Sequence, residues 1–214
     1  MTRGIVAVSQ RIDDYPERGE YRDALDQQLC VWIARAGFVP VQVPNRLGDD
    51  AAIHAWLHAV SPAGIVLSGG ADVGKHHDRD RTEGVLLEHA KAFDLPLLGI
   101  CRGMQFLALQ FGAQLVEREG HVRIRHRLIP RTGEKIPATV NSYHTWTLTE
   151  CPSMFQTLAT CEADGTIEAF AHTNLPWEGW MWHPERESPF AEADHSRFEI
   201  LFGGSGRPQS GAGL

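Results

Sequence analysis

The sequence has few cysteines, no long apolar run and no block of positive charge. Four cysteines stand in 214 residues without C-x-x-C spacing, which argues against a disulfide framework and favours a reducing, cytoplasmic environment. No apolar run approaches the length of a membrane span, and the first residues lead directly into an expected strand, so neither a membrane anchor nor a signal peptide is predicted. The net charge of −7, without a compensating cluster of Lys and Arg, argues against a nucleic-acid partner.

Short apolar segments alternate with segments of helical periodicity in the first half of the chain. Fully apolar strands in such an alternation are typical of a parallel sheet covered by helices on both faces. After Val116 the pattern becomes richer in strands. One domain over 1–202 is expected, followed by a flexible Gly/Ser/Pro-rich tail over 203–214. Strands are predicted over 5–9, 39–43, 65–67, 95–98, 138–140, 167–171 and 179–182, a polar loop over 10–19, and helices over 20–36, 50–60, 82–93, 106–111 and 195–202.

The most informative segment is Gly99-Ile-Cys-Arg-Gly-Met-Gln105, which lies between an apolar strand and an apolar helical run. A cysteine between two glycines at a strand-to-helix turn is a nucleophile elbow in which sulfur replaces the serine hydroxyl. The free N–H groups and positive dipole end at the start of a helix favour a thiolate. Cys101 is therefore the predicted nucleophile, with a buried structural cysteine as the alternative.

A cysteine nucleophile needs a base, and the base needs a group that orients it. His183 and Glu185, in Trp-His-Pro-Glu after an apolar strand, are predicted to fill these two roles. Acyl transfer also needs N–H donors for the developing oxyanion. The Arg102 N–H directly follows the nucleophile, and Gly70 ends another strand in Ser-Gly-Gly, at the same edge of a parallel sheet. A plain tight turn is the alternative for Gly69 and Gly70.

The Ser-Gly-Gly strand end, the elbow and Trp-His-Pro-Glu, in this order, resemble the class I glutamine amidotransferase family. The resemblance extends from Ile5 to about Phe202. It implies a flavodoxin-like three-layer α/β fold with a mostly parallel central sheet and a nucleophile elbow. It also implies that Cys101, His183 and Glu185 form a catalytic triad. The implied oxyanion donors are Gly70 and Arg102, and the implied substrate-binding residues are Gly69, Gln105 and the segment Asn141, Ser142, Tyr143 and His144, whose backbone would hold the substrate α-carboxylate.

Two further features narrow the resemblance. Arg79-Asp-Arg-Thr-Glu83 resembles the R-D-x-x-E motif of the γ-glutamyl hydrolase branch, in which the carboxylates of Asp80 and Glu83 would suit a glutamyl α-ammonium. The alternative is a helix N-cap at Asp80 with an acid in the first turn. Flanking segments such as Ser9-Gln-Arg11 and Ile167-Glu-Ala-Phe170 are similar to the γ-glutamyl-CDP-amidate hydrolases. Those enzymes release glutamate and leave cytidine diphosphoramidate for bacterial surface polysaccharides.

The resemblance therefore implies a cysteine hydrolase that cleaves a γ-glutamyl amide through a thioester, with γ-glutamyl-CDP-amidate as the favoured substrate and no metal or organic cofactor. A glutaminase subunit that supplies ammonia to a separate synthetase is one alternative, and a general γ-glutamyl peptide or amine hydrolase is another. A non-catalytic binding protein on a retained fold is a third, against which the intact triad argues. The expected partner is a small γ-glutamyl substrate, with no nucleic acid and no membrane.

Eleven histidines raise the question of a metal site. His76, His77 and Asp78 are adjacent, which is poor geometry for one tetrahedral ion, and no metal site is predicted. The one concentrated basic stretch, 121–127, contains His121, His126 and three arginines, and it is interpreted as a solvated loop. The alternative places this stretch against the diphosphate of a nucleotide-linked substrate.

Overall fold

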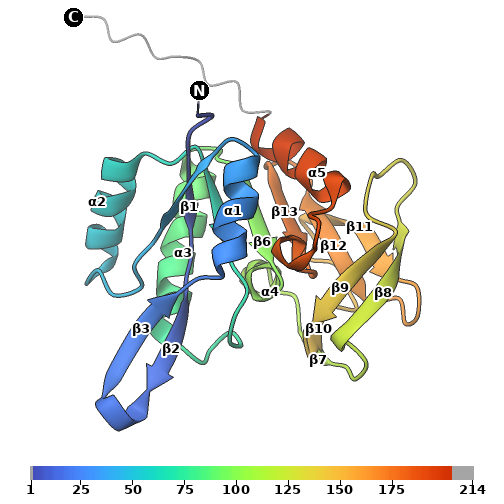
Figure 1. Ribbon diagram of the computed structural model, residues 1–214, viewed down its shortest axis with the longest axis horizontal. Helices are drawn as coiled ribbons and strands as arrows, with labels where there is room; N and C mark the ends of the chain where they lie inside the picture. The colour runs from blue at the N-terminus through green and yellow to red at the C-terminus, as the bar shows by residue number, and fades with distance from the viewer. Residues whose placement is uncertain (1, 204–214) are drawn as a thin grey trace, which may run out of the picture.

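The computed structural model describes residues 2–203, which form a nine-stranded sheet with helices on both faces (Figure 1). One half of the sheet is parallel, in the order β4-β1-β5-β6-β13, which counted along these strands is the flavodoxin-like order 2-1-3-4-5. The other half continues antiparallel through β12, β11, β8 and β9. The bounds are β1 Ile5–Val8, β4 Val39–Gln42, β5 Gly64–Leu67, β6 Leu97–Ile100, β13 Trp177–Trp180, β12 Ile167–His172, β11 Phe155–Cys161, β8 Val122–Pro130 and β9 Thr139–Tyr143.

Helices enclose the sheet as the expected three-layer α/β fold requires. On one face lie α1 (Gln27–Arg35) and α5 (Glu192–Gly203), and on the other lie α2 (Asp50–Val60), α3 (His77–Ala92) and α4 (Arg102–Gln110). Aspartate caps start two of them: Asp26 accepts from the Gln28 N–H and Asp49 accepts from the Ala52 N–H. The smaller elements are the hairpin β2 (Arg11–Tyr15) and β3 (Glu20–Ala24), the pair β7 (Val116–Glu117) and β10 (Trp146–Thr147), and the turns Pro16–Arg18 and Pro184–Arg186.

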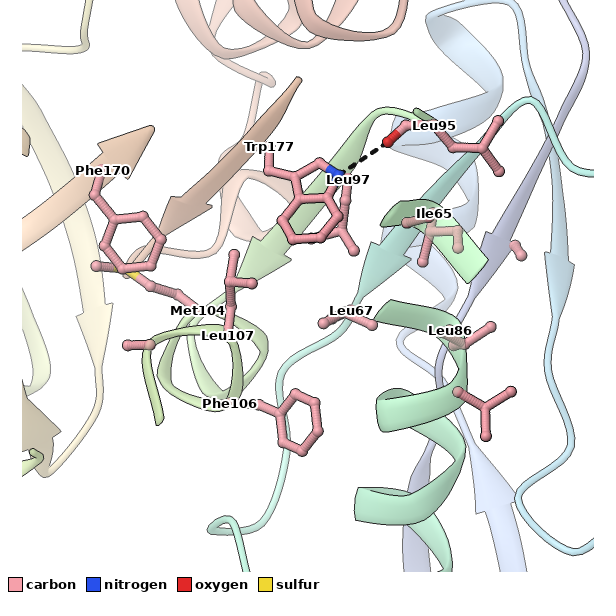
Figure 2. Packing of buried hydrophobic residues seen from close by; sticks show 14 of the residues in the cluster. Ile65, Leu67, Leu86, Leu95, Leu97, Met104, Phe106, Leu107, Phe170 and Trp177 are labelled. Atoms are coloured by element: carbon pink, nitrogen blue, oxygen red, sulfur yellow. Dashed lines mark hydrogen bonds between the residues drawn. The ribbon is translucent and has the colours of Figure 1, made fainter. Parts of the chain in front are cut away.

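The core fixes where the parallel strands end. On the α3 and α4 face, Leu86 and Leu107 pack against Ile65 and its neighbours in the sheet (Figure 2). The indole of Trp177 is buried in the same cluster and donates to the Leu95 carbonyl at 3.0 Å. Each such side chain contributes about 1.5–3 kcal/mol by leaving water. This packing holds the carboxyl ends of β5, β6 and β13 at one edge, where residues 68–70, 101 and 183 follow them.

The structure corrects several of the predicted elements. The helix predicted over 20–36 begins at Gln27, because 20–24 pairs with 11–15 in a hairpin that projects from the sheet (Figure 1). The stretch 121–127, interpreted as a solvated loop, is largely β8, and β11 is absent from the predicted strands. In β8 Arg alternates with Val, Ile, His or Leu, a period-two pattern that indicates a strand. The three arginines of this stretch favour the interpretation as a solvated loop and thereby hide the alternation.

Two expectations concern the chain as a whole. Among the described residues no helix is both long and apolar enough to cross a membrane. The predicted tail covers 203–214; Gly203 is the last residue of α5, and 204–214 lie outside the described residues.

Candidate active site

The segment around Cys101 has the backbone of a strained elbow. Cys101 follows β6, has φ 49° and ψ −105°, and donates its N–H to the Trp180 carbonyl at 2.7 Å. A left-handed φ at a residue with a side chain costs about 1–3 kcal/mol. Both glycines are required, since a Cβ on Gly99 would lie 2.7 Å from the Gly103 backbone and one on Gly103 would lie 2.1 Å from the Leu67 carbonyl oxygen. The thiol therefore stands at the start of α4, and the first turn of this helix lies against the end of β5.

His183 and Glu185 follow β13, the parallel neighbour of β6 in the sheet. His183 Nδ1 lies 2.6 Å from Glu185 Oε1, and both side chains are buried. Burial alone would lower the pKa of His183, but hydrogen bonds with Cys101 and Glu185 raise this pKa to about 9. A Cβ on Gly69 would lie 2.6 Å from His183 Cε1, so the glycine leaves room for the ring. The structure thus brings the three predicted triad residues together.

Asn141 and Tyr143 of β9 contact His183 directly. The Asn141 amide donates to the His183 carbonyl at 2.8 Å and accepts from the His183 N–H at 3.0 Å. The same amide donates to Glu187 at 2.8 Å. The Tyr143 ring meets the imidazole edge-on, with centroids 5.9 Å apart. The resemblance implies a role only for the backbone of Asn141. In the structure its side chain positions His183.

The other residues of that segment have different surroundings. Ser142 is fully buried and donates its hydroxyl to the His121 carbonyl. The His144 side chain is also buried, with Nδ1 3.1 Å from the Trp146 carbonyl oxygen. Gln105 donates to the same carbonyl at 2.9 Å. Gln105 and His144 therefore contact the same carbonyl oxygen. The His144 ring packs against the rings of His121 and His126.

Arg79 holds the loop that contains Gly69 and Gly70. Its buried guanidinium donates to the carbonyls of Ser68 at 2.6 Å and Gly69 at 3.1 Å. A Cβ on Gly70, where φ is +147°, would lie 2.3 Å from Arg79 Nη1. Arg79 thereby fixes the peptide planes beside the proposed oxyanion donor Gly70. The sequence indicates Arg79 only as part of a motif, without a role of its own, because the full burial of its side chain is visible only in the fold.

The structure contradicts the substrate-binding role expected for Glu83. Its carboxylate is fully buried, accepts from the Ser9 hydroxyl at 2.7 Å and Arg79 Nε at 3.0 Å, and pairs with Arg102. Two guanidinium groups and a hydroxyl already surround it, so a substrate ammonium cannot reach it. Asp80 accepts from the Gly74 N–H at 2.9 Å and from the Arg102 side chain. Because α3 begins at His77, Asp80 is not its N-cap, which excludes that alternative as well.

Two hollows adjoin the triad. A cavity of about 50 Å³ lies beside Gly70 and His183. An open groove of about 770 Å³ lies between α1 and the segment 185–190, with Arg35, Tyr143 and Arg186 among its lining residues. Glu185 and Arg186 line both the cavity and the groove, so the two hollows adjoin each other.

The basic stretch 121–127 contacts the region of the groove through an ion pair between Arg125 and Glu187. Arg125 Nη1 lies 3.0 Å and 3.1 Å from the two carboxylate oxygens of Glu187, and Glu187 is the residue that Asn141 contacts. The Arg125 side chain is about half exposed. His121 and His126 are buried instead, contrary to the solvated-loop interpretation.

Comparisons with known proteins identify the family to which this chain is similar. The model of the family "Glutamine amidotransferase class-I" matches residues 20–198. The glutamine-hydrolysing component of the GMP synthase of Thermococcus kodakarensis is 30% identical over 135 residues, 60% of this chain and 69% of the relative. The γ-glutamyl-CDP-amidate hydrolase of Campylobacter jejuni is 33% identical over 130 residues, 58% of this chain and 62% of the relative.

Solved structures support the same fold. A putative GMP synthase component from Thermoplasma acidophilum superposes with a TM-score of 0.69 at 23% identity, covering 93% of this chain and 92% of that one. A glutamine amidotransferase from Thermotoga maritima superposes with a TM-score of 0.62 at 16% identity, covering 92% and 83%. Because the family model matches residues 20–198, which are most of this chain, the chain belongs to the class I glutamine amidotransferase family.

Proposed function

We propose that this chain is a cysteine hydrolase that releases glutamate from a γ-glutamyl amide through a thioester. Membership of the family supports an enzyme that acts on C–N bonds. The observation that carries the proposal is the buried His183–Glu185 pair, 2.6 Å apart, which follows β13, the strand next to the one that presents Cys101 on a strained elbow. A nucleophile, a base and an orienting carboxylate are the groups that acyl transfer requires.

In the first half of the reaction, His183 takes the proton of the Cys101 thiol. The raised pKa of His183, about 9, favours the resulting imidazolium at neutral pH. The thiolate attacks the γ-carbonyl carbon, and the N–H groups of Arg102 and Gly70 are the proposed donors to the oxyanion. The imidazolium protonates the leaving nitrogen as the C–N bond breaks, which leaves a γ-glutamyl thioester on Cys101.

In the second half, a water molecule gives its proton to His183 and attacks the thioester carbonyl. The C–S bond breaks, glutamate leaves, and Cys101 returns as a thiolate paired with the imidazolium. Glu185 holds the His183 ring through Nδ1 in both halves, so that Nε2 is the atom that accepts and donates each proton. Gln105, Gly69 and the segment 141–143 remain the proposed walls of the glutamyl site.

The favoured leaving group is cytidine diphosphoramidate. The similarity to the Campylobacter jejuni γ-glutamyl-CDP-amidate hydrolase supports this choice. The groove of about 770 Å³ beside the triad has the size of a ligand pocket. Arg35 and Arg186 offer guanidinium groups to phosphate oxygens. The Arg186 guanidinium lies 4.5 Å from the centroid of the Tyr143 ring, so a base that stacks on Tyr143 would use the opposite face of the ring.

A second function is a glutaminase subunit that supplies ammonia to a separate synthetase. Two relatives favour it: the GMP synthase component already described, and anthranilate synthase component 2 of Thermococcus kodakarensis, 30% identical over 139 residues. Its chemistry at Cys101 is the same, and its product is free ammonia. General hydrolysis of γ-glutamyl peptides or amines is close in chemistry to both.

The test measures glutamate release from γ-glutamyl-CDP-amidate and from L-glutamine side by side, with Cys101→Ala as the control. We expect a strong preference for the nucleotide substrate that is lost in the variant. A preference for L-glutamine would favour the ammonia-supplying function. Equal glutamate release by wild type and Cys101→Ala would contradict the thioester mechanism itself.

A further inference from the structure

Three histidines and one glutamate form a buried cluster in the antiparallel half of the sheet. His121 precedes β8, His126 lies within it, His144 follows β9 and Glu168 lies on β12. Their exposed fractions are 3, 6, 3 and 0%. One nitrogen or carboxylate oxygen from each lies within 4.8 Å of the corresponding atoms of the other three. Neither the triad nor the proposed glutamyl site uses the imidazoles or the carboxylate of this cluster.

The atoms that face each other have no hydrogen-bond partner among residues 2–203. These atoms are His121 Nδ1, His126 Nε2, His144 Nε2 and both carboxylate oxygens of Glu168. A buried polar atom without a partner costs about 1–3 kcal/mol, and a charged one costs more. Five such atoms in one place need a common partner that the protein atoms do not supply.

The distances in the cluster fit an ion better than they fit hydrogen bonds. Glu168 Oε1 lies 3.7 Å from His121 Nδ1, 3.7 Å from His126 Nε2 and 3.5 Å from His144 Nε2. Hydrogen bonds between nitrogen and oxygen are shorter, about 2.7–3.2 Å. Two ligands bonded at about 2.0–2.2 Å to one tetrahedral ion are about 3.3–3.6 Å apart.

For two of the three histidines, the partner of the outer nitrogen fixes which nitrogen faces inward with a lone pair. His121 Nε2 lies 2.9 Å from a carboxylate oxygen of Asp164, and His144 Nδ1 lies 3.1 Å from the Trp146 carbonyl oxygen. A carbonyl and a carboxylate only accept, so these outer nitrogens carry the hydrogens. The inner nitrogens of His121 and His144 then direct lone pairs at Glu168. Histidines that bind metals are held in this way by an outer carboxylate or carbonyl.

The backbone of β8 is deformed at the point that brings two of the histidines to one face. Residues five apart in a regular strand point to opposite faces. Arg123 has φ 58°, and the pairing of β8 with β9 shifts register between Val122 and Ile124. This bulge takes up one residue. His121 and His126 therefore stack on the same side, with ring centroids 4.5 Å apart.

From these observations we propose that His121, His126, His144 and Glu168 bind one zinc ion. Three imidazoles and a carboxylate are a donor set that Zn²⁺ binds, and their four ligand atoms lie within 4.8 Å of one another. The two carboxylates present, Glu168 and Asp164, balance the charge of a divalent ion. All four ligands come from the protein and are buried, which is the arrangement of a structural site. The prediction from sequence that the chain binds no metal is opposed by this cluster.

The proposed ion fastens β9 to β12 next to the triad. His144 directly follows β9, the strand from which Asn141 contacts His183, and Ser142 donates to the carbonyl of the ligand residue His121. The proposed zinc therefore keeps β9 in the register that places Asn141 against His183. This role does not depend on which γ-glutamyl amide the enzyme cleaves.

The test is the zinc content of the full-length, untagged protein after incubation with ZnCl₂ and exhaustive dialysis, measured by mass spectrometry of the metal. We expect about one zinc per chain in the wild type and at least a tenfold loss in Glu168→Gln and His144→Ala. His58→Ala, which removes an exposed histidine on α2, is the matched control and keeps the full content. Less than a tenth of an ion per wild-type chain, or equal contents in all four proteins, would overturn the proposal.

A second measurement avoids any variant that fails to fold. The wild type is stripped with a chelator, loaded with Co²⁺ and examined by visible absorption. A tetrahedral site gives intense bands, and one equivalent of ZnCl₂ is expected to abolish them. The pale spectrum of six-coordinate Co²⁺, or bands that zinc does not displace, would overturn the assignment.

Discussion

A single side chain, that of Asn141, holds both backbone polar atoms of His183. Nδ2 donates to the His183 carbonyl at 2.8 Å, and Oδ1 accepts from the His183 N–H at 3.0 Å. Both hydrogen bonds are buried, and they join β9 to the segment that follows β13. The antiparallel half of the sheet therefore fixes the backbone from which the His183 imidazole is presented.

Asn141→Ala is expected to reduce kcat by about 10–100-fold with a smaller change in KM. The substitution leaves the buried N–H of His183 without its partner, which costs about 1–3 kcal/mol. It also removes one of two hydrogen bonds to the His183 carbonyl, which still accepts from the Arg186 N–H at 3.1 Å. Steady-state glutamate release measures kcat and KM, and thermal unfolding measures stability. Asn174→Ala removes an exposed asparagine and is the matched control. An unchanged kcat in a folded Asn141→Ala protein would contradict the positioning role.

The pKa of His183 is expected to be about 9 in the wild type and to fall in Cys101→Ala. Burial opposes the charged ring, whereas the hydrogen bonds with Cys101 and Glu185 favour it, so removing one of them lowers the pKa. Titration of the imidazole by NMR measures both values. The folded pKa lies above the ordinary value of 6.5, so this group stabilises the fold fully below about pH 6.5 and loses that contribution as the pH rises through about 9. A wild-type pKa near 6.5 would refute the assignment.

Glu83→Ala is expected to lower the free energy of unfolding by about 3–5 kcal/mol, because it leaves the buried guanidinium groups of Arg79 and Arg102 without their shared carboxylate. Urea unfolding measures this change. Glu88→Ala, at an exposed position on the same helix, is expected to change it by less than about 0.5 kcal/mol. If Glu83→Ala left stability unchanged and raised only KM, the substrate-binding role that the sequence suggested would be restored.

The sequence predicts those parts of the site that are encoded in consecutive residues. The elbow around Cys101 and the His183–Glu185 pair each lie within a few residues of a strand end, and parallel strand ends meet at one edge. The side chain of Arg79 cannot be placed in the same way, because its contacts with Ser68 and Gly69 depend on the path of a loop.

The histidine cluster lies further beyond sequence reasoning. His121, His144 and Glu168 come together only through the pairing of four antiparallel strands, and the bulge at Arg123 breaks the period that would link His121 to His126. The charged face of β8 is also the reason for the loop interpretation. The sequence predicts the elements that local propensity determines. It does not predict contacts that depend on the register between distant strands.

Gly103→Ala and Gly84→Ala are expected to have opposite effects. At Gly103 a Cβ would lie 2.1 Å from the Leu67 carbonyl oxygen, so α4 must move away from β5 and take Cys101 with it. We expect a loss of activity of at least 100-fold and a lower Tm. At Gly84 in α3 a Cβ meets no atom of the described residues within 4 Å, and alanine is expected to stabilise the helix by about 0.5–1 kcal/mol. Thermal unfolding and glutamate release measure both variants; equal behaviour would show that the close approach at Gly103 is not required.

Arg125→Ala and Arg35→Ala are expected to raise KM for γ-glutamyl-CDP-amidate by about 10–100-fold and to leave hydrolysis of L-glutamine unchanged. Arg35 lines the groove beside the triad, and Arg125 reaches the same region through Glu187. A hydrogen bond between a guanidinium and a phosphate contributes about 1.5–3 kcal/mol, which is the source of this range. The plain amide has no phosphate and therefore loses nothing.

Arg127→Ala is the matched control, because Arg127 lies two residues along the same face of β8 and pairs with Glu162, not with Glu187. Its KM for both substrates is expected to equal that of the wild type. Equal losses on both substrates in Arg125→Ala would mean that the side chain acts through Glu187 and Asn141 on His183, since that route would affect every γ-glutamyl amide alike. Arg35 has no such route through Glu187, so a selective loss in Arg35→Ala alone would still assign the groove to the nucleotide.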